Sequence, residues 1–212
     1  MSTAFSVQPL LASALSAVPS HFKPNELAYL ALTKKPEDVI RDAVSLELRT
    51  TVPSGYEVAR EWRRCDLAVL SFQNATIPNS GKPQSIVEFK SMYTFDPLIN
   101  GKSWDHLPMA LLKDMKTRRK KFSAAKEVIG VLAATHTNAQ IGMPYQDYIT
   151  KYWEDINRAF GKYGNNASAI LKACTQQIQT LLAKNGFTFA PCYINAGQWT
   201  GVSVEIHFWI IK

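Results

Sequence analysis

The sequence predicts an α/β domain in which helices flank a mixed central sheet. Two observations favour this class. Apolar, β-branched runs at 67–72, 86–89 and 128–134 are each bounded by charged or turn-forming residues, as buried strands are. Longer segments between and after these runs carry apolar residues at helical spacing. The predicted order is α-β-β-β-α-β, followed by two helices and a last strand.

The first quarter of the chain is expected to be helical. Residues 1–35 are interpreted as a helical lead-in with a helix near 25–32, and a firmer helix is predicted over 36–49. Pro36 suits a first helical position, and the two acidic residues after it suit the positive end of the helix dipole. The apolar stripe of this helix reaches Glu47 after Ile40, Ala43 and Val44. A carboxylate is therefore predicted where the helical period expects a core residue.

Strands and one helix are predicted for the middle of the chain. A strand over 56–62 is followed by strands at 67–72 and 86–90, which are placed to pair as a hairpin. A helix is predicted over 108–122. The apolar run at 128–134 is typical of a buried parallel strand.

The last third is predicted to contain two helices, over 145–160 and 167–184. Residues 202–211 alternate in polarity and are expected to form an antiparallel strand at the sheet edge. The sequence shows no internal repeat, low-complexity tract or linker, so residues 1–212 are assigned to one domain.

Composition narrows the possible functions. The net charge of +7, from 24 basic and 17 acidic residues, is compatible with a polyanionic partner. Three widely spaced cysteines, an odd number, argue against a disulfide framework and a zinc site, and they fit a reducing cytoplasm. The N-terminal segment lacks the features of a signal peptide or a membrane span.

Charged residues interrupt two of the predicted strands. Glu88 and Lys90 are two positions apart in the run that begins at Ser85, so they point to the same side of that strand. Asp66 stands at the start of the preceding apolar strand. An unpaired charge in a buried strand is costly, so these side chains need partners or a function. If the strands form a hairpin, Asp66 and Glu88 converge on one cation beside Lys90.

Such a cluster suits phosphodiester chemistry. Mg²⁺ takes oxygen ligands, and Asp66, Glu88 and the Phe89 carbonyl supply them. A cation held there polarises a phosphate and lowers the pKa of a bound water. Lys90 is expected to orient that water and to offset negative charge in the transition state.

The helix with Glu47, the strand with Asp66 and the tripeptide Glu88-Phe89-Lys90 together resemble the PD-(D/E)XK nuclease superfamily, which includes restriction endonucleases and repair nucleases. The resemblance covers residues 47–121. It implies a restriction-endonuclease-like αβββαβ core, to which the C-terminal helices and strand are added. Asp66 and Glu88 would be the metal-binding acids, Lys90 the catalytic lysine, and Glu47 the extra acid that some members carry on the first helix. The family's proline is absent, because Cys65 precedes Asp66.

The resemblance implies a Mg²⁺-dependent nuclease, with Mn²⁺ as an alternative ion and DNA as the expected substrate. Small nucleases that cut both strands commonly act as dimers, so a homodimer is compatible with this function. The helix after the third strand carries a polar patch like that of many members, at 113–116. Its cations are expected to attract nucleic acid: Lys113, Lys116, Arg118, Arg119, Lys120 and Lys121.

Less specific interpretations remain open for each feature. Glu88 and Lys90 can be a structural ion pair at a sheet edge, and Glu47 can pair with Arg49 or Arg64. The basic run can be a solvated helix face. A nucleic-acid-binding or assembly module that kept the fold and lost catalysis is the main alternative function. A small-molecule enzyme lacks support, because the sequence has no phosphate-binding glycine loop and no Ser/His/Asp arrangement.

Overall fold

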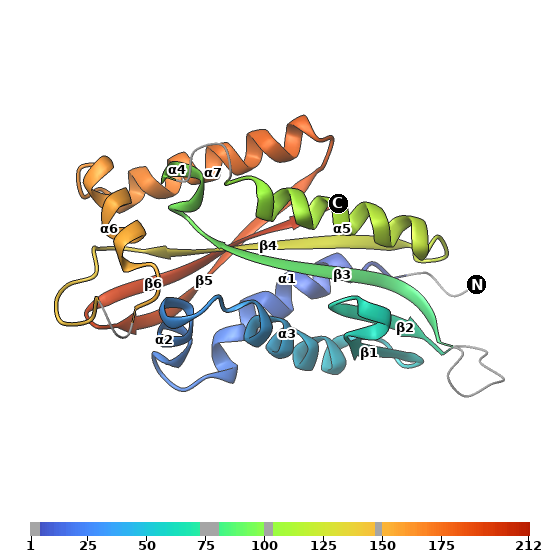
Figure 1. Ribbon diagram of the computed structural model, residues 1–212. Coiled ribbons are helices and arrows are strands. Elements are labelled where there is room, and N and C mark those ends of the chain that lie inside the picture. The colour runs from blue at the N-terminus through green and yellow to red at the C-terminus, as the bar shows by residue number, and fades with distance from the viewer. Residues whose placement is uncertain (1–4, 73–80, 100–103, 147–149) are drawn as a thin grey trace.

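A six-stranded mixed sheet, of order β1-β2-β3-β4-β6-β5, forms the middle layer of the protein (Figure 1). The computed structural model describes residues 5–72, 81–99, 104–146 and 150–212. Strands β3 and β4 are parallel, and the other neighbouring strands are antiparallel. The strands are β1 (Tyr56–Arg60), β2 (Leu67–Ser71), β3 (Lys82–Tyr93), β4 (Glu127–Thr137), β5 (Phe189–Trp199) and β6 (Val202–Ile211).

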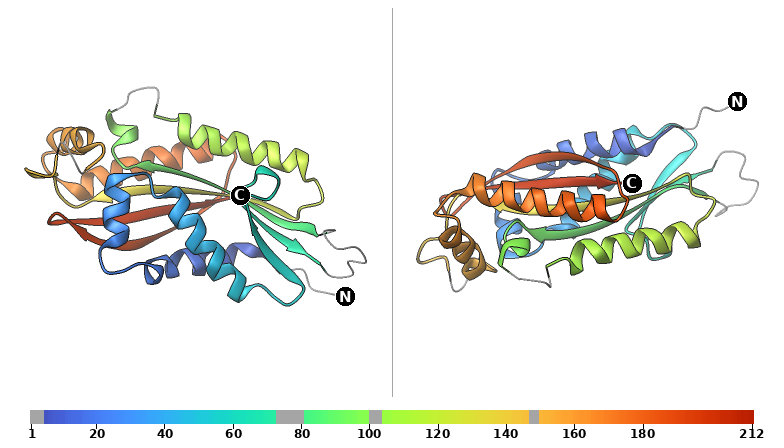
Figure 2. Two further views of the ribbon diagram at one scale, coloured as in Figure 1. Left: turned by 60° about the horizontal axis from the view of Figure 1, so that its bottom comes forward. Right: turned by 90° about the horizontal axis from the view of Figure 1, so that it is seen from above.

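Helices cover both faces of the sheet (Figures 1 and 2). One face carries α1 (Val7–Ala17), α2 (Glu26–Thr33) and α3 (Glu37–Thr51), and the other carries α5 (His106–Lys121) and α7 (Ala167–Lys184). The shorter helical elements are η1 (Val18–His21), η2 (Trp62–Arg64), α4 (Asp96–Ile99) and α6 (Trp153–Lys162). Among the described residues, no helix has the length and hydropathy needed to span a lipid bilayer.

Strand β3 separates the two apolar cores. Val87, Phe89 and Tyr93 pack into the core beneath α1, α2 and α3, while Ile86 and Met92 pack into the core beneath α5 and α7. Because side chains alternate along a strand, Glu88 and Lys90 leave β3 on the α5 side. The apolar residues before and after them therefore fix the direction in which both charged side chains start.

The predicted α/β class is confirmed. The strands β2 and β3 do pair as a hairpin, and the buried parallel strand predicted over 128–134 is β4, which is parallel to β3. The position of the last strand is wrong, because β6 lies between β4 and β5 and the edge strand is β5. The helix expected over 145–160 begins at Trp153, after Tyr152 adopts a left-handed conformation with φ of 65°. Residues 147–149 of that prediction, and most of the β2–β3 connection (73–80), lie outside the described residues.

Candidate active site at the open edge of β3

Strand β3 loses its β2 neighbour halfway along its length. The β2–β3 register runs from Ser71↔Lys82 to Leu67↔Val87, and β3 continues for six more residues against β4 alone. The backbone groups of alternate residues on this second half therefore face an open edge. Buried N–H groups need acceptors, so something must replace the missing strand.

Side-chain carboxylates take the place of β2 along the second half of β3. Three of them, from different elements, accept hydrogen bonds from successive outward-facing N–H groups of β3. These bonds run from Phe89 N–H to Asp66 Oδ2 (2.7 Å), from Ser91 N–H to Glu37 Oε2 (2.9 Å) and from Tyr93 N–H to Asp96 Oδ2 (2.8 Å). Hydrogen bonds from amides to ionised carboxylates are stronger than neutral ones. The second half of β3 is thus hydrogen-bonded to β4 on one edge and to three side-chain carboxylates on the other.

Lys90 and Glu37 form an ion pair at this edge. The distance from Lys90 Nζ to Glu37 Oε1 is 3.5 Å, and each side chain keeps about a quarter of its surface exposed. Burial raises the pKa of Glu37, Lys90 partly offsets this, and the negative charge of Asp66 adds to the increase. Glu37, Lys90 and Asp66 therefore share one electrostatic environment.

Glu88 points under α5 and is 4% exposed. Arg118 Nε donates to its Oε1 at 2.6 Å. Burial raises the pKa of Glu88 to about 7; Arg118 opposes the increase, and the nearby charge of Asp66 adds to it. A carboxylate desolvated in this way and paired with one specific cation is typical of functional sites, although structural pairs share the property.

A glycine lies opposite Glu88 beneath α5. Gly130 of β4 is the register partner of Glu88, and a Cβ atom at this position would overlap Met115 Sδ and press on Leu111 of α5. The missing side chain lets α5 pack close to the strands. The side chain of Arg118 then spans the short gap to Glu88.

The loop between β1 and β2 is held by the same helix. Arg118 also donates to the carbonyl oxygen of Arg64, and Lys121 Nζ donates to that of Arg63 at 3.3 Å. In this loop Glu61, Arg63 and Arg64 all have left-handed backbones, with φ of 52°, 51° and 71°. Such conformations are unfavourable for residues with side chains and persist only when the surroundings impose them. The bonds from α5 therefore help to hold the turn that presents Asp66.

The structure thus places Asp66, Glu88 and Lys90 around the middle of β3, where the pairing with β2 ends. The N–H and C=O groups of one strand residue point to the same edge, so the Phe89 carbonyl faces the side on which Asp66 binds its N–H. Around Phe89 the arrangement offers carboxylate oxygens of Asp66 and Glu88 and the Phe89 carbonyl. The Lys90 ammonium is held by Glu37 and not by either of these carboxylates.

Glu47 lies elsewhere. Its Oε1 is 2.6 Å from Nε2 of His21 in η1. It follows Glu37 by ten positions on α3, which is about 15 Å along the helix axis. In that turn of α3 the buried residue is Leu48, and the neighbouring Glu47 is not part of the buried face. The carboxylate that α3 contributes at the β3 edge is Glu37, which the sequence pattern had explained by the helix dipole alone.

The basic helix divides into two groups. Arg118 points inward to Glu88, so it is engaged in the site and not on the solvated face. The other predicted nucleic-acid contacts are exposed: Lys113, Lys116, Arg119, Lys120 and Lys121. The positive surface of α5 is therefore formed by five of the six predicted residues.

The donor chemistry at the edge fits a hard divalent cation such as Mg²⁺, which prefers carboxylate and carbonyl oxygens. Within the described ranges, however, no group of three or more His, Cys, Asp or Glu side chains is arranged to hold a metal ion. Arg118 already occupies one oxygen of Glu88. Arg41 Nη1 lies 3.9 Å from Oδ1 of Asp66. A cation at this site would have to replace Arg118 as the partner of Glu88 and compete with Arg41 for Asp66.

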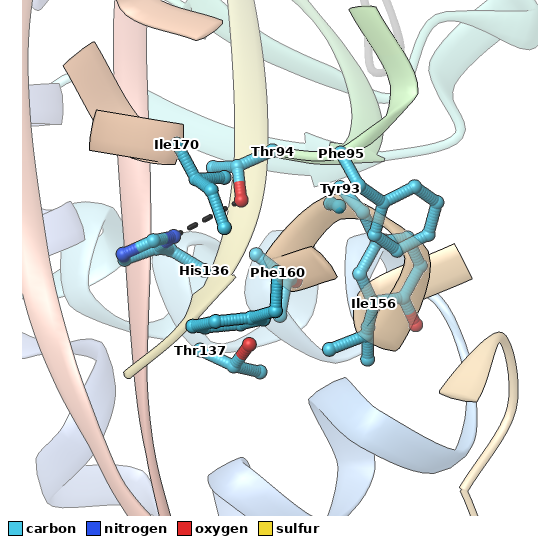
Figure 3. Close-up of a pocket in the computed structure, with 10 residues that line it drawn as sticks. Tyr93, Thr94, Phe95, His136, Thr137, Ile156, Phe160 and Ile170 are labelled. Atoms are coloured by element: carbon cyan, nitrogen blue, oxygen red, sulfur yellow. Dashed lines mark hydrogen bonds between the residues drawn. The ribbon is translucent and has the colours of Figure 1, made fainter. Parts of the chain in front are cut away.

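A separate cavity lies beyond the C-terminal end of β3 and is too small for a substrate. Figure 3 shows Thr94, His136 and Phe160 among its lining residues, and its volume is about 10 Å³, room for a single water. A hydrogen bond of 3.0 Å joins Thr94 Oγ1 to His136 Nδ1. Burial lowers the pKa of His136 to about 4, so the imidazole is neutral at pH 7. This histidine is part of the core.

Comparisons of the chain with protein-family models, with curated proteins and with solved structures found no significant match.

Proposed function

We propose that this protein is a metal-dependent nuclease that hydrolyses phosphodiester bonds in DNA. The observation that carries the proposal is the placement of Asp66, Glu88 and Lys90 around Phe89 in the open half of β3, where Asp66 binds the backbone of the residue between the other two. One carboxylate from a neighbouring strand, with a carboxylate and a lysine two residues apart, is the arrangement that the PD-(D/E)XK resemblance implies.

The order of elements supports the same proposal. Helix α3 is followed by the antiparallel strands β1, β2 and β3, and then by α5 and the parallel strand β4. A restriction-endonuclease-like core has this αβββαβ order. On these grounds we also propose that the fold is of that type, with β5, β6, α6 and α7 as additions.

Each side chain has a proposed task. Asp66, Glu88 and the Phe89 carbonyl would hold Mg²⁺ or Mn²⁺, which supplies Lewis-acid activation of the phosphate and of water. Lys90 would orient the attacking water and stabilise the added negative charge of the transition state. Glu37 would hold the ammonium group of Lys90 in place through their ion pair.

Arg118 would act as the counter-ion of Glu88 before the cation arrives. A released guanidinium at this place could bind a non-bridging phosphate oxygen, since arginine recognises phosphate in a bidentate manner. The exposed cations of α5 would attract the DNA backbone without selecting a sequence.

The test uses plasmid, linear duplex and single-stranded DNA with Mg²⁺, Mn²⁺ or EDTA. We expect cleavage with either ion and none with EDTA. The variant Lys90→Ala should lower the rate at least about 100-fold, because it removes a group that stabilises the transition state. Lys82→Ala, an exposed lysine on the same strand, is the matched control and should cut like the wild type. Cleavage that survives EDTA would remove the metal from the mechanism.

A catalytically inactive nucleic-acid-binding module is the second candidate. The ion pair of Glu88 with Arg118 favours it, because a permanent guanidinium partner keeps a metal from Glu88. Under this alternative the wild type is inert with Mg²⁺ and Mn²⁺ but still binds DNA, and the Lys90→Ala variant binds equally well.

A further inference from the structure

A basic groove with an apolar floor lies beside α5, on the side away from β2. Its volume is about 320 Å³, near the lower limit for small-molecule sites. Figure 2 (right) shows α5 and α7 on the same face of the sheet, with the C-terminus of the chain near the end of α7. We call this site the α5–α7 groove; it is lined by Met115, Lys116, Arg119, Lys120, Val128, Phe187 and Lys212.

A helix cap places the aromatic ring in the groove. Gly186 ends α7 with φ of 75°; its N–H donates to the Ala183 carbonyl (3.0 Å), and the Phe187 N–H donates to that of Leu182 (3.1 Å). This bond pair is a Schellman motif, which usually brings the residue after the glycine back onto the helix. Phe187 packs partly on the α5–α7 core and keeps part of its ring accessible.

The cations of the groove carry an unbalanced positive charge. In the described part of the chain, Lys116, Arg119 and Lys120 form no ion pair with an acidic side chain, whereas Lys212 pairs with Glu127 at 3.0 Å. The Lys116 ammonium is 5.6 Å from the centroid of the Phe187 ring. Positive charge beside an accessible aromatic ring is a combination that recognises a phosphate together with a π-face.

We propose that the α5–α7 groove binds single-stranded DNA, with a base stacked on Phe187 and the adjoining phosphates on Lys116, Arg119 and Lys120. The choice of DNA rests on the proposed nuclease function. An unpaired strand is required because the faces of paired bases are stacked inside a duplex, whereas every unpaired base offers a π-face to an aromatic side chain. Stacking of a base outweighs the exposed contact of Lys116 with the ring, so the lysine can move to the phosphate.

The groove and the candidate active site lie on two sides of one helix. Arg118 leaves α5 toward Glu88, and its neighbour Arg119 leaves it toward the groove. A strand that crosses α5 would therefore connect the two sites. The protein would then hold an unpaired tail of the DNA in the α5–α7 groove while the scissile phosphate lies at the edge of β3.

Binding measured in EDTA tests the groove independently of cleavage. Fluorescence anisotropy with a labelled oligo(dT) and with a blunt duplex of equal length should show tighter binding of the single strand. Phe187→Leu keeps the apolar packing and removes the aromatic ring, and we expect it to weaken oligo(dT) binding about 10-fold while leaving duplex binding unchanged. Thermal unfolding checks that the variant is folded, and Phe187→Tyr should restore binding.

The charges are tested with Gln at Lys116, Arg119 and Lys120 together. This triple variant should lower the slope of log affinity against log salt concentration by about 2 for the single strand. A charge-matched control places Gln at three exposed lysines outside the groove, Lys23, Lys34 and Lys172, and should change the slope less.

Equal affinity of wild type and Phe187→Leu for oligo(dT), or tighter binding of the duplex by the wild type, would overturn the inference. If the protein does not cleave DNA but its binding of oligo(dT) depends on Phe187, the nuclease proposal is rejected and the groove is still a site for single-stranded DNA. The two failures are therefore distinguishable.

Discussion

The two halves of β3 are built from the same strand but differ in their neighbours. From Lys82 to Val87 the strand pairs with β2 on one side, and from Ser85 onward with β4 on the other. Beyond Val87 only β4 remains, and side-chain carboxylates take the place of β2. The charged residues Glu88 and Lys90 both lie in this second half.

The difference shows where a central sheet can accommodate charge. In the paired half the buried side chains Ile86 and Val87 belong to the two apolar cores, and the buried polar residues Gln84 and Ser85 are uncharged. In the open half Glu37 both accepts the Ser91 N–H and pairs with Lys90, and α5 provides the partner of Glu88. One carboxylate therefore both satisfies a backbone N–H group of the open edge and holds the charge of Lys90.

The largest expected effect comes from removing the partner of Glu88. Arg118→Gln leaves a buried carboxylate without a counter-ion and should lower the free energy of unfolding by about 3–5 kcal/mol at pH 8. If a cation can replace Arg118, added Mg²⁺ should stabilise this variant more than it stabilises the wild type, because binding to the folded state alone raises stability. Urea unfolding with and without MgCl₂ measures both effects.

Arg119→Gln is the control for this experiment. It removes an exposed charge from the next position of α5 and should change stability by no more than about 0.5 kcal/mol. Equal losses in the two variants would show that the Arg118 pair is an ordinary surface contact and that the two halves of β3 do not differ as described.

The second effect is a dependence on pH. The pKa of Glu88 is raised from 4.5 to about 7, so between these values the folded state keeps a proton that the unfolded state has released. Glu88 therefore contributes stability below pH 4.5 that is lost as the pH rises to 7, by about 3 kcal/mol in total. Glu88→Gln removes this dependence. Its stability relative to the wild type should rise by that amount between pH 4.5 and 7.5.

Urea unfolding across this pH range gives the measurement, with Glu57→Gln on β1 as an exposed control. That control should parallel the wild type at every pH. A Glu88→Gln variant that also parallels the wild type would mean that Glu88 is ionised throughout, as in a well-paired salt bridge.

Strand alternation was enough to predict half of this site. It places Glu88 and Lys90 on one side of β3, and the hairpin brings Asp66 to the same strand. The sequence predicted that β2 begins at Leu67, but it could not show that Leu67 lies opposite Val87, because pairing register is set by contacts between the strands. The open edge, which requires the capping acids, follows from that register.

Two further features depend on packing between distant elements. The helical period drew attention to Glu47, whereas the angle at which α3 meets the sheet brings its first turn, with Glu37, to β3. Among six similar cations on α5, Arg118 is the inward one because it follows the buried Leu111 and Met115 by seven and three positions, on the same face of the helix. Strand β5 was missed because Pro191 and Gly197 interrupt the apolar alternation, as is common for an edge strand.

The smallest expected effect is the difference between substituting Glu37 and substituting Glu47, the two glutamates of α3. This difference tests whether the open half of β3 is functional as well as structural. Glu37→Gln retains an oxygen that can accept the Ser91 N–H but loses the charge that holds Lys90, so it should cost about 1 kcal/mol of stability. Under the nuclease proposal it should lower kcat about 10-fold, with little change in KM, and alter the pH profile of cleavage, because Lys90 acts mainly in the transition state. Glu47→Gln loses a comparable pair with His21 and should leave kcat and its pH profile unchanged. Steady-state kinetics from pH 6 to 9 on both variants decides the matter: equal kcat values would restrict Glu37 to capping the strand edge.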